Sequence, residues 1–187
     1  MARAGIDSTA VVAAAAAVAD ADGLEAVTLR RLAEELGVRS PSLYAHIGGL
    51  DDLRRRLGAR GNTELATTLG HAVEGRSGPD ALRALAVAYR DYARAHPGTY
   101  AALQRASDLA DDDEGRAAGE AVVRVALAAL RAYPVEGDDA IHAVRLIRIA
   151  LHGFVTLEAA GGFAMALSAD ETFERLLGLL DLGLRRS

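Results

Sequence analysis

One short run of the sequence, SPSLYAH at residues 40–46, carries side chains that could read a nucleic acid. Serine hydroxyls hydrogen-bond to phosphates or base edges, and an alanine methyl can contact the methyl group of thymine. Tyrosine and histidine side chains are long enough to reach phosphates, and two arginines before the run would add positive charge. The candidate contact residues on this reasoning are Arg30, Arg39, Ser40, Ser42, Tyr44, Ala45 and His46.

The segment from Val27 to Leu53 contains the two short helices that would position this run. Gly37 can adopt the left-handed backbone that ends the first helix, and Ser40 followed by Pro41 is a typical start for the second. This spacing is typical of a helix-turn-helix, whose second helix enters the DNA major groove. An ordinary helical hairpin with a solvated face has the same spacing, so the residues alone leave both interpretations open. The apolar positions fit a three-helix core with the preceding helix, and they are Leu32, Leu36, Val38, Leu43 and Ile47.

Apolar residues recur at spacings of three and four along nearly the whole chain, and strand-like alternation is absent, which predicts an all-α fold. Glycine, proline and capping residues divide the pattern into about nine helices. We expect Ser8 or Thr9 to cap the first helix, and Ser40 to cap a third helix that ends at the glycines 48–49. The expected helices cover residues 8–21, 29–36, 41–47, 50–73, 80–96, 99–106, 115–133, 138–160 and 169–185.

The composition excludes several classes of protein. The chain of 187 residues has no cysteine, which excludes disulfide scaffolds, zinc ribbons and cysteine nucleophiles. Its 26 acidic residues outnumber its 21 basic residues, all of them arginine, and the formal charge is −5. The longest apolar stretch, residues 10–19, is shorter than the roughly 20 residues of a membrane span. Because the chain has no cysteine and no membrane span, we expect a cytoplasmic protein. Catalytic motifs are absent and the histidines are scattered, so we expect that the protein is not an enzyme and holds no metal or cofactor.

The eighth expected helix is apolar around most of its circumference between residues 144 and 157, which predicts burial on several sides. In a chain of this length the natural partner is a second copy, so we expect a homodimer formed through helices eight and nine. The alternative is a monomer in which helix eight is the central core element. The ninth helix offers further apolar surface for a dimer at Phe173, Leu176, Leu177, Leu180 and Leu184.

A polar stripe interrupts the eighth helix, because spacings of three and four place on one face Arg145, Arg148, His152 and Thr156. These side chains could line a pocket, or they could form ion pairs with acidic residues such as Glu120 or Glu158. Apolar and aromatic walls with a few polar groups are typical of small-molecule sites. The candidate ligand-binding residues are Tyr89, Tyr92, Tyr100, Leu103, Arg148, His152 and Phe163.

The stretch SPSLYAHIGGLDDL resembles the recognition helix and the following helix start of the TetR family, the tetracycline-repressor-like regulators. The residues that match are Ser40, Pro41, Ser42, Leu43, Tyr44 and His46, and in the preceding helix Thr28, Arg30, Leu32, Ala33 and Gly37. The resemblance covers residues 7–57 and adds Thr28 and Pro41 to the candidate DNA contacts. It implies three N-terminal helices for DNA, a longer fourth helix and a divergent helical ligand domain. Farther along, His152-Gly153-Phe154 is similar to a His-Gly motif in helix eight of one subgroup of the family.

One departure from the family pattern lies at the start of the fourth helix, where many members carry a lysine that pairs with phosphate. This sequence has Asp51 and Asp52 there, which suit a helix N-terminus but repel phosphate. Residues 1–60 hold eight arginines and eight acidic residues, so the region is neutral, which predicts modest non-specific affinity for DNA. The arginines that could replace the lysine are Arg54, Arg55, Arg56 and Arg60.

Taken with the resemblance, the sequence predicts a helix-turn-helix DNA-binding domain at residues 1–50 and a helical ligand-binding and dimerisation domain at residues 51–187. We expect a homodimeric regulator, in this family most often a repressor, that binds a palindromic operator in double-stranded DNA and is released by a small-molecule effector. The alternative is a helical small-molecule-binding or adaptor protein with a degenerate DNA-binding head. The neutral head and the pair Asp51 and Asp52 favour that alternative.

Overall fold

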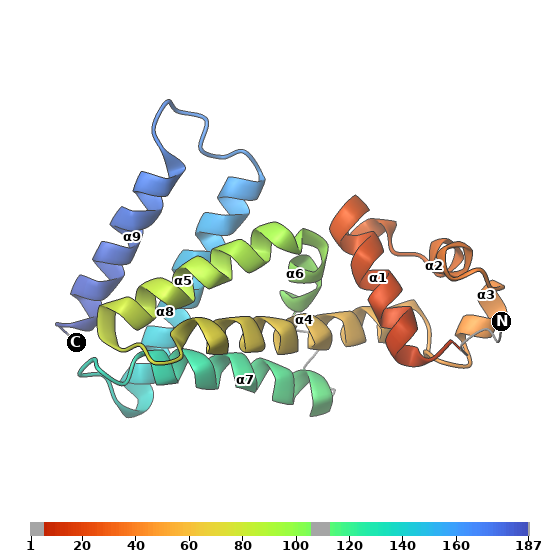
Figure 1. Cartoon of the computed structure of the whole chain (residues 1–187), viewed down its shortest axis with the longest axis horizontal. Coiled ribbons are helices and arrows are strands. Elements are labelled where there is room, and N and C mark those ends of the chain that lie inside the picture. The colour runs from red at the N-terminus through yellow and green to blue at the C-terminus, as the bar shows by residue number, and fades with distance from the viewer. Residues whose placement is uncertain (1–5, 106–112, 187) are drawn as a thin grey trace. The chain divides into compact units, whose positions relative to one another are not determined.

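The computed structural model describes residues 6–105 and 113–186. These residues contain helices and connections but no strand, which confirms the predicted all-α class (Figure 1). The elements are α1 (Ser8–Asp22), the 3₁₀ helix η1 (Leu24–Ala26), α2 (Leu29–Leu36), α3 (Ser40–Leu43), α4 (Leu50–Val73), α5 (Gly78–Ala95), α6 (Pro97–Leu103), α7 (Asp113–Ala129), α8 (Gly137–Ala159) and α9 (Ala169–Leu184).

Several expected helix ends are wrong by one to four residues, and two expected caps are also wrong. Asp7 caps α1 in place of Ser8 or Thr9, because its Oδ1 accepts a hydrogen bond from the Ala10 backbone N–H at 2.7 Å. The helix α3 is a single turn whose cap position is Arg39, so Ser40 is its first residue and not its cap. Residues 44–46 follow as turns.

The chain packs as two compact units. One is formed by residues 1–64 with 95–119, which we call the head unit, and the other by residues 65–94 with 120–187, which we call the C-terminal unit. The helix α6 thus packs with the N-terminal helices. The functional boundary at residue 50 stays a prediction, because packing does not test what each segment binds.

The core of the head unit brings together α1, α2, α3 and the first turns of α4, drawn in red to orange in Figure 1. Leu32 of α2 and Leu43 of α3 are fully buried, and Ile47 is nearly so. Leu36 and Val38 are partly buried against the same core. All five apolar positions predicted from the helix-turn-helix spacing therefore face the core.

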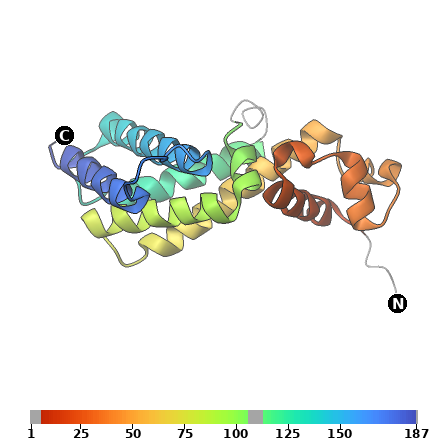
Figure 2. The ribbon, with the colours of Figure 1, turned by 90° about the horizontal axis from the view of Figure 1, so that it is seen from above.

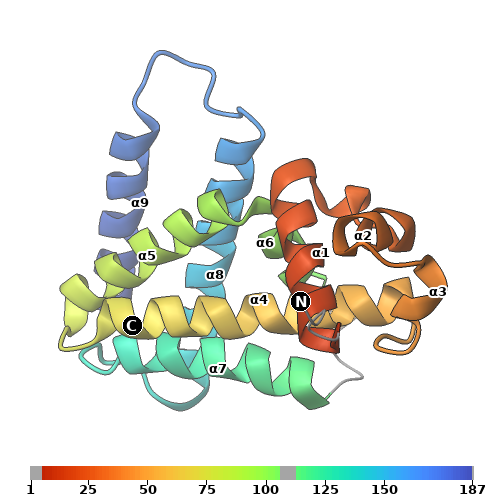
Figure 3. The same ribbon diagram turned by 45° about the vertical axis from the view of Figure 1, so that its right-hand side comes forward.

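The helix α6 is joined tightly to α1 within the head unit (Figure 3). Asp20 of α1 accepts two hydrogen bonds from Thr99, at 2.7 Å from the backbone N–H and at 3.1 Å from the hydroxyl. Its carboxylate also lies 3.0 Å from Nδ1 of His96. A Cβ atom on Gly98 would lie only 2.0 Å from the carbonyl oxygen of Ala19, so this close approach requires glycine.

In the C-terminal unit, α8 and α9 form an antiparallel pair, drawn side by side in blue in Figure 2. Phe154, Val155 and Leu151 of α8 are buried, and α9 contributes Phe173 and Leu177. By length and composition α8 is the one described helix that could span a membrane, and 33% of its most apolar window is buried within the protein. The expectation from apolar runs that no segment could span a membrane is thus not met by length and composition. The same test is passed by helices of soluble proteins.

Candidate DNA interface and the C-terminal unit

The turn between α2 and α3 is built by the residues that the sequence pattern singled out. Thr28 caps α2, because its hydroxyl accepts a hydrogen bond from the Arg31 backbone N–H at 3.2 Å. Gly37 ends α2 in the left-handed conformation, with φ 66° and ψ 34°, which L side chains rarely adopt. The Val38 N–H then bonds to the Ala33 carbonyl at 2.9 Å, as in a Schellman turn. The chain therefore enters α3 in a fixed direction.

The candidate DNA contacts lie mostly on the solvent side of this motif. Tyr44 is 61% exposed although it is large and aromatic. Ser40 and His46 are half-buried, because they flank the buried Leu43 and Ile47. Contact between these side chains and DNA stays a prediction. The exposed candidates are Thr28, Arg30, Arg39, Pro41, Ser42, Tyr44 and Ala45.

Most arginines near the motif are already paired with carboxylates. Arg54 pairs with Glu25 at 3.3 Å, and Arg60 pairs with Glu64 at 2.7 Å. Arg30 and Arg39 are exposed and form no ion pair with any residue that the structure describes. These two are consequently the cations that remain available to phosphates beside α3.

Asp52 has a structural role that accounts for its place in the sequence. Its Oδ2 accepts a hydrogen bond from the Gly48 N–H at 2.8 Å, and its two oxygens pair with Arg55 and Arg56 at 2.9 Å each. Partial burial acts to raise the pKa of Asp52, but the bonds from Gly48, Arg56 and Arg55 outweigh it and lower the pKa. The idea that Arg55 and Arg56 replace a phosphate-binding lysine is thus weakened, since both already hold Asp52.

The candidate ligand-binding residues divide between the two units. Tyr89 and Tyr92 of α5 are buried in the C-terminal unit, whereas Tyr100 and Leu103 of α6 are buried in the head unit. The remaining three belong to the C-terminal unit, where Arg148 is exposed and His152 and Phe163 are half-buried. A single pocket formed by all seven stays a prediction.

His152 lies in an environment that disfavours its charged form. Burial and the neighbouring charge of Arg148 both lower its pKa, with burial the larger cause. A neutral imidazole offers one donor and one acceptor, which suits hydrogen bonding to an uncharged ligand group.

Sequence reasoning missed the most elaborate polar cluster of the C-terminal unit, which centres on Arg90 of α5. Arg90 is only 7% exposed, and its guanidinium lies over the rings of Phe154 and Phe173, at 5.1 and 4.7 Å from their centroids. Its Nη2 lies 2.7 Å from Asp170 at the start of α9. Arg90 therefore connects α5 with both helices of the α8–α9 pair.

Glu158 of α8 completes this cluster. Its carboxylate accepts hydrogen bonds from Nε and Nη2 of Arg90, at 3.1 and 2.5 Å, and from the same atoms of Arg94, at 3.0 and 2.7 Å. These bonds, with that of Arg90 foremost, lower the pKa of Glu158 to about 2 against the opposing effect of burial. These hydrogen bonds to Glu158 come from arginines of α5, whereas the sequence suggested ion pairs with the polar stripe on α8.

A helix-turn-helix with polar side chains on its exposed side, followed by a second helical unit, is typical of DNA-binding transcriptional regulators. Family models match both parts: "Bacterial regulatory proteins, tetR family" covers residues 11–57, and "Tetracyclin repressor-like, C-terminal domain" covers residues 82–180. The HTH-type transcriptional regulator Rv0681 of Mycobacterium tuberculosis is 36% identical over 176 residues, which cover 94% of this chain and 80% of that protein. The chain belongs to the TetR family.

Solved structures share the fold along nearly the whole chain. A protein of unknown function from Rhodococcus sp. RHA1 aligns with a TM-score of 0.80 at 26% identity, covering 97% of this chain and 96% of that one. Apo ActR from Streptomyces coelicolor aligns with a TM-score of 0.73 at 20% identity, covering 99% and 97%. ActR has also been solved in complex with (S)-DNPA. At such identity the likeness shows the fold alone.

Proposed function

We propose that this protein is a ligand-responsive repressor that binds a palindromic operator as a homodimer and leaves it when a small molecule binds the C-terminal unit. The observation that carries the proposal is the set of exposed side chains Pro41, Ser42, Tyr44 and Ala45. Arg30 and Arg39 lie beside them and form no ion pair with a described residue. An effector acts by preferring a conformation whose two heads no longer match half-sites about 34–36 Å apart. The complex of ActR with (S)-DNPA shows that a protein of this fold takes a small ligand. We place the regulator in the cytoplasm, without catalytic activity or a cofactor.

The double substitution Ser42→Ala/Tyr44→Ala is expected to weaken operator binding by tenfold or more, because it removes hydroxyl and aromatic contacts from the reading face. A tenfold loss corresponds to about 1.4 kcal/mol. Fluorescence anisotropy with the DNA beside the protein's own gene, titrated with non-specific competitor, measures the change. Neither side chain is in the core, so the variant should melt at the wild-type temperature.

Val87→Ala, which shortens an exposed side chain of α5, is the control and should bind operator DNA as the wild type does. Equal binding by the double variant and the wild type would show that the proposed reading surface is wrong. Absence of saturable binding by the wild type would favour the alternative, a small-molecule-binding or adaptor protein with a degenerate head. The pairing of Arg54, Arg55 and Arg56 with carboxylates is the observation that supports that alternative.

Exposed apolar side chains on α8 and α9 support the proposed dimer. Leu146, Ile149 and Leu157 recur at helical spacing on α8, opposite the buried face, and Ile149 is 67% exposed. A Cβ atom on Gly153, which lies in the same stripe, would meet nothing within 4 Å, so the described residues provide no packing reason for this glycine. On α9 the exposed leucines are Leu179 and Leu182. The choice of Phe173, Leu177 and Leu184 for the dimer surface was wrong, because these side chains are buried within the chain. A second copy would bury the exposed side chains of both helices and pack closely at Gly153.

Ile149→Asp is expected to convert the dimer to a monomer, because it places a charge in the apolar stripe without a partner. Size-exclusion chromatography with light scattering should give about half the wild-type mass across micromolar concentrations. Val123→Asp, which introduces the same charge at an exposed apolar position of α7, should leave the mass unchanged. A monomeric wild type, or a dimer that tolerates Ile149→Asp, would contradict the proposed interface.

A further inference from the structure

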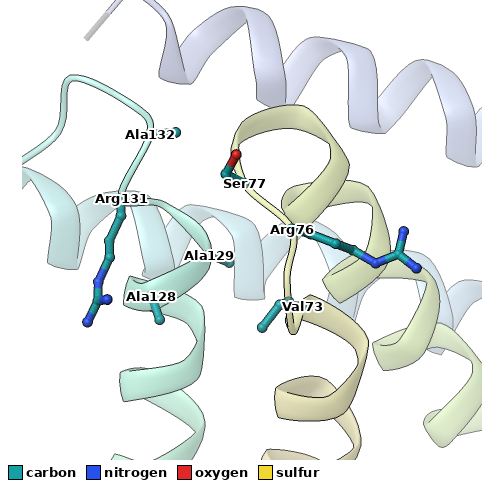
Figure 4. Close-up of a pocket in the computed structure, with 7 residues that line it drawn as sticks. All are labelled: Val73, Arg76, Ser77, Ala128, Ala129, Arg131 and Ala132. Carbon is teal, nitrogen blue, oxygen red and sulfur yellow. The ribbon is translucent and has the colours of Figure 1, made fainter.

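The ends of three helices in the C-terminal unit surround a cavity of about 270 Å³ that the proposed regulatory function does not use. Its floor is lined by Ala128, Ala129 and Ala132, where α7 ends. Ala129 is buried, whereas Ala128 and Ala132 are exposed, so the cavity is open to solvent on this side. The turn between α4 and α5 closes the other side with Arg76 and Ser77. Figure 4 shows the Ser77 side chain on this turn, across from Ala132.

The walls of this cavity are firmly held by their own backbone. The Arg76 N–H bonds to the Val73 carbonyl at 3.0 Å, which fixes the turn after α4. After α7, the Leu130 N–H is shared between two carbonyls, at 3.2 and 3.1 Å, and the Leu130 side chain is buried. Tyr133 anchors the same connection, because its hydroxyl donates a hydrogen bond of 2.7 Å to Asp181 of α9. These hydrogen bonds therefore hold both walls of the cavity in place within the C-terminal unit.

Two arginines at the rim give the cavity its charge. Arg76 and Arg131 extend to opposite sides of it in Figure 4, and both are exposed. Neither forms an ion pair with a residue that the structure describes, although the chain carries a net charge of −5 and many of its other arginines hold a carboxylate. Rotation about the flexible arginine side chain would bring either guanidinium over the opening.

We infer that this cavity binds a small amphiphilic anion, with an apolar body against the alanine floor and a carboxylate or phosphate held by Arg76, Arg131 and the Ser77 hydroxyl. Ligand pockets usually measure roughly 300–1,000 Å³, so the cavity suits a short body. Guanidinium pairs with carboxylates and phosphates through charge-assisted hydrogen bonds, and the hydroxyl adds a further donor. The floor is apolar, so it contributes by removing the body of the ligand from water.

Isothermal titration calorimetry of the full-length protein without DNA tests the inference with hexanoate and hexyl phosphate as probes. Both should bind saturably, and whichever binds more tightly identifies the head group. Hexanol, which has the body without the charge, and inorganic phosphate, which has the charge without the body, should each bind at least tenfold more weakly.

Arg76→Gln and Arg131→Gln should each weaken binding of the anionic probes about tenfold, and Ala128→Leu should abolish it by filling the cavity. Arg124→Gln removes the same charge from an exposed site on α7 away from the cavity and should change nothing. No saturable binding, equal binding of hexanol and hexanoate, or equal losses in the Arg124 and Arg131 variants would overturn the inference. Because DNA is absent from the titration, failure here leaves the proposed operator binding untouched.

Discussion

Gly98→Ala is expected to destabilise the head unit strongly, by about 3 kcal/mol or more, and to lower its midpoint of unfolding. The added methyl would lie 2.0 Å from the carbonyl oxygen and 2.1 Å from the carbonyl carbon of Ala19. These are backbone atoms at the end of α1, so no rotation of a side chain can relieve the clash. Overpacking of a rigid core usually costs about 1–3 kcal/mol, and a backbone clash of this size belongs at the upper limit.

Relief of the clash requires α6 to move away from α1, which would also break the hydrogen bonds between Asp20 and Thr99. Because α1 packs directly on α2, we expect operator affinity to fall with stability. Urea denaturation followed by circular dichroism measures the first effect, and anisotropy measures the second.

Gly119→Ala provides the matched control for the loss of a helical glycine. A Cβ atom at Gly119 of α7 would meet nothing within 4 Å, so this variant should gain up to about 1 kcal/mol from helix propensity. A Gly98→Ala protein as stable as the wild type would show that α6 does not require the close approach to α1.

Glu158→Gln is expected to destabilise the C-terminal unit by about 3 kcal/mol. The substitution keeps the shape of the side chain but removes the charge that faces Arg90 and Arg94. Removing one partner of a buried ion pair typically costs about 3–5 kcal/mol, because the remaining charge is left uncompensated. Asp170 still contacts Arg90, which places the expected cost at the lower end of that range.

The same substitution should change how stability depends on pH. The pKa of Glu158 is lowered from 4.5 to about 2 in the folded protein, so its stabilising effect is complete above pH 4.5 and is lost as pH falls toward 2. The wild type should therefore lose more stability between these values than Glu158→Gln does. Urea denaturation at pH 6 and pH 3 measures both proteins.

Glu171→Gln, which removes an exposed carboxylate paired with Arg175 four residues along α9, is the control. Surface pairs of this kind contribute about 0.3–0.5 kcal/mol, so its stability at pH 6 should stay near that of the wild type. An identical loss of stability in both glutamate variants would show that the burial of Glu158 does not increase its contribution to stability.

Local sequence signals predicted the helix-turn-helix well, because the features that build it act over a few residues. Thr28 caps the helix that follows it, and Gly37 supplies the one backbone conformation that ends that helix in a turn. The burial of Leu32 and Leu43 followed from helical periodicity. The cap of α1 was predicted wrongly because three neighbouring residues, Asp7 to Thr9, can all serve as caps.

Contacts between distant segments could not be predicted from one sequence. Arg90 and Glu158 are 68 residues apart, and nothing local distinguishes Arg90 from the other arginines of α5. Tyr100 had been grouped with Tyr89 and Tyr92 as an aromatic wall, yet it packs in the other unit. The contacts of Asp52 with Gly48, Arg55 and Arg56 could not be predicted either. A single sequence does not distinguish a carboxylate that bonds to its own helix start from one that repels phosphate.

The pairing of the head unit's arginines also determines how the regulator finds its operator. Among the described arginines beside α3, Arg30 and Arg39 form no ion pair, so the proposed dimer neutralises about four phosphates and releases roughly 0.9 counterions for each of them. Long-range steering toward DNA is correspondingly weak, and encounter with random sequence is brief. Residence on the operator must therefore come from short-range fit in the groove. On this count log K falls against log salt with a slope of about −3.6, so a fourfold rise in salt weakens operator binding roughly 150-fold. A head with more available arginines would lose its operator at a lower salt concentration.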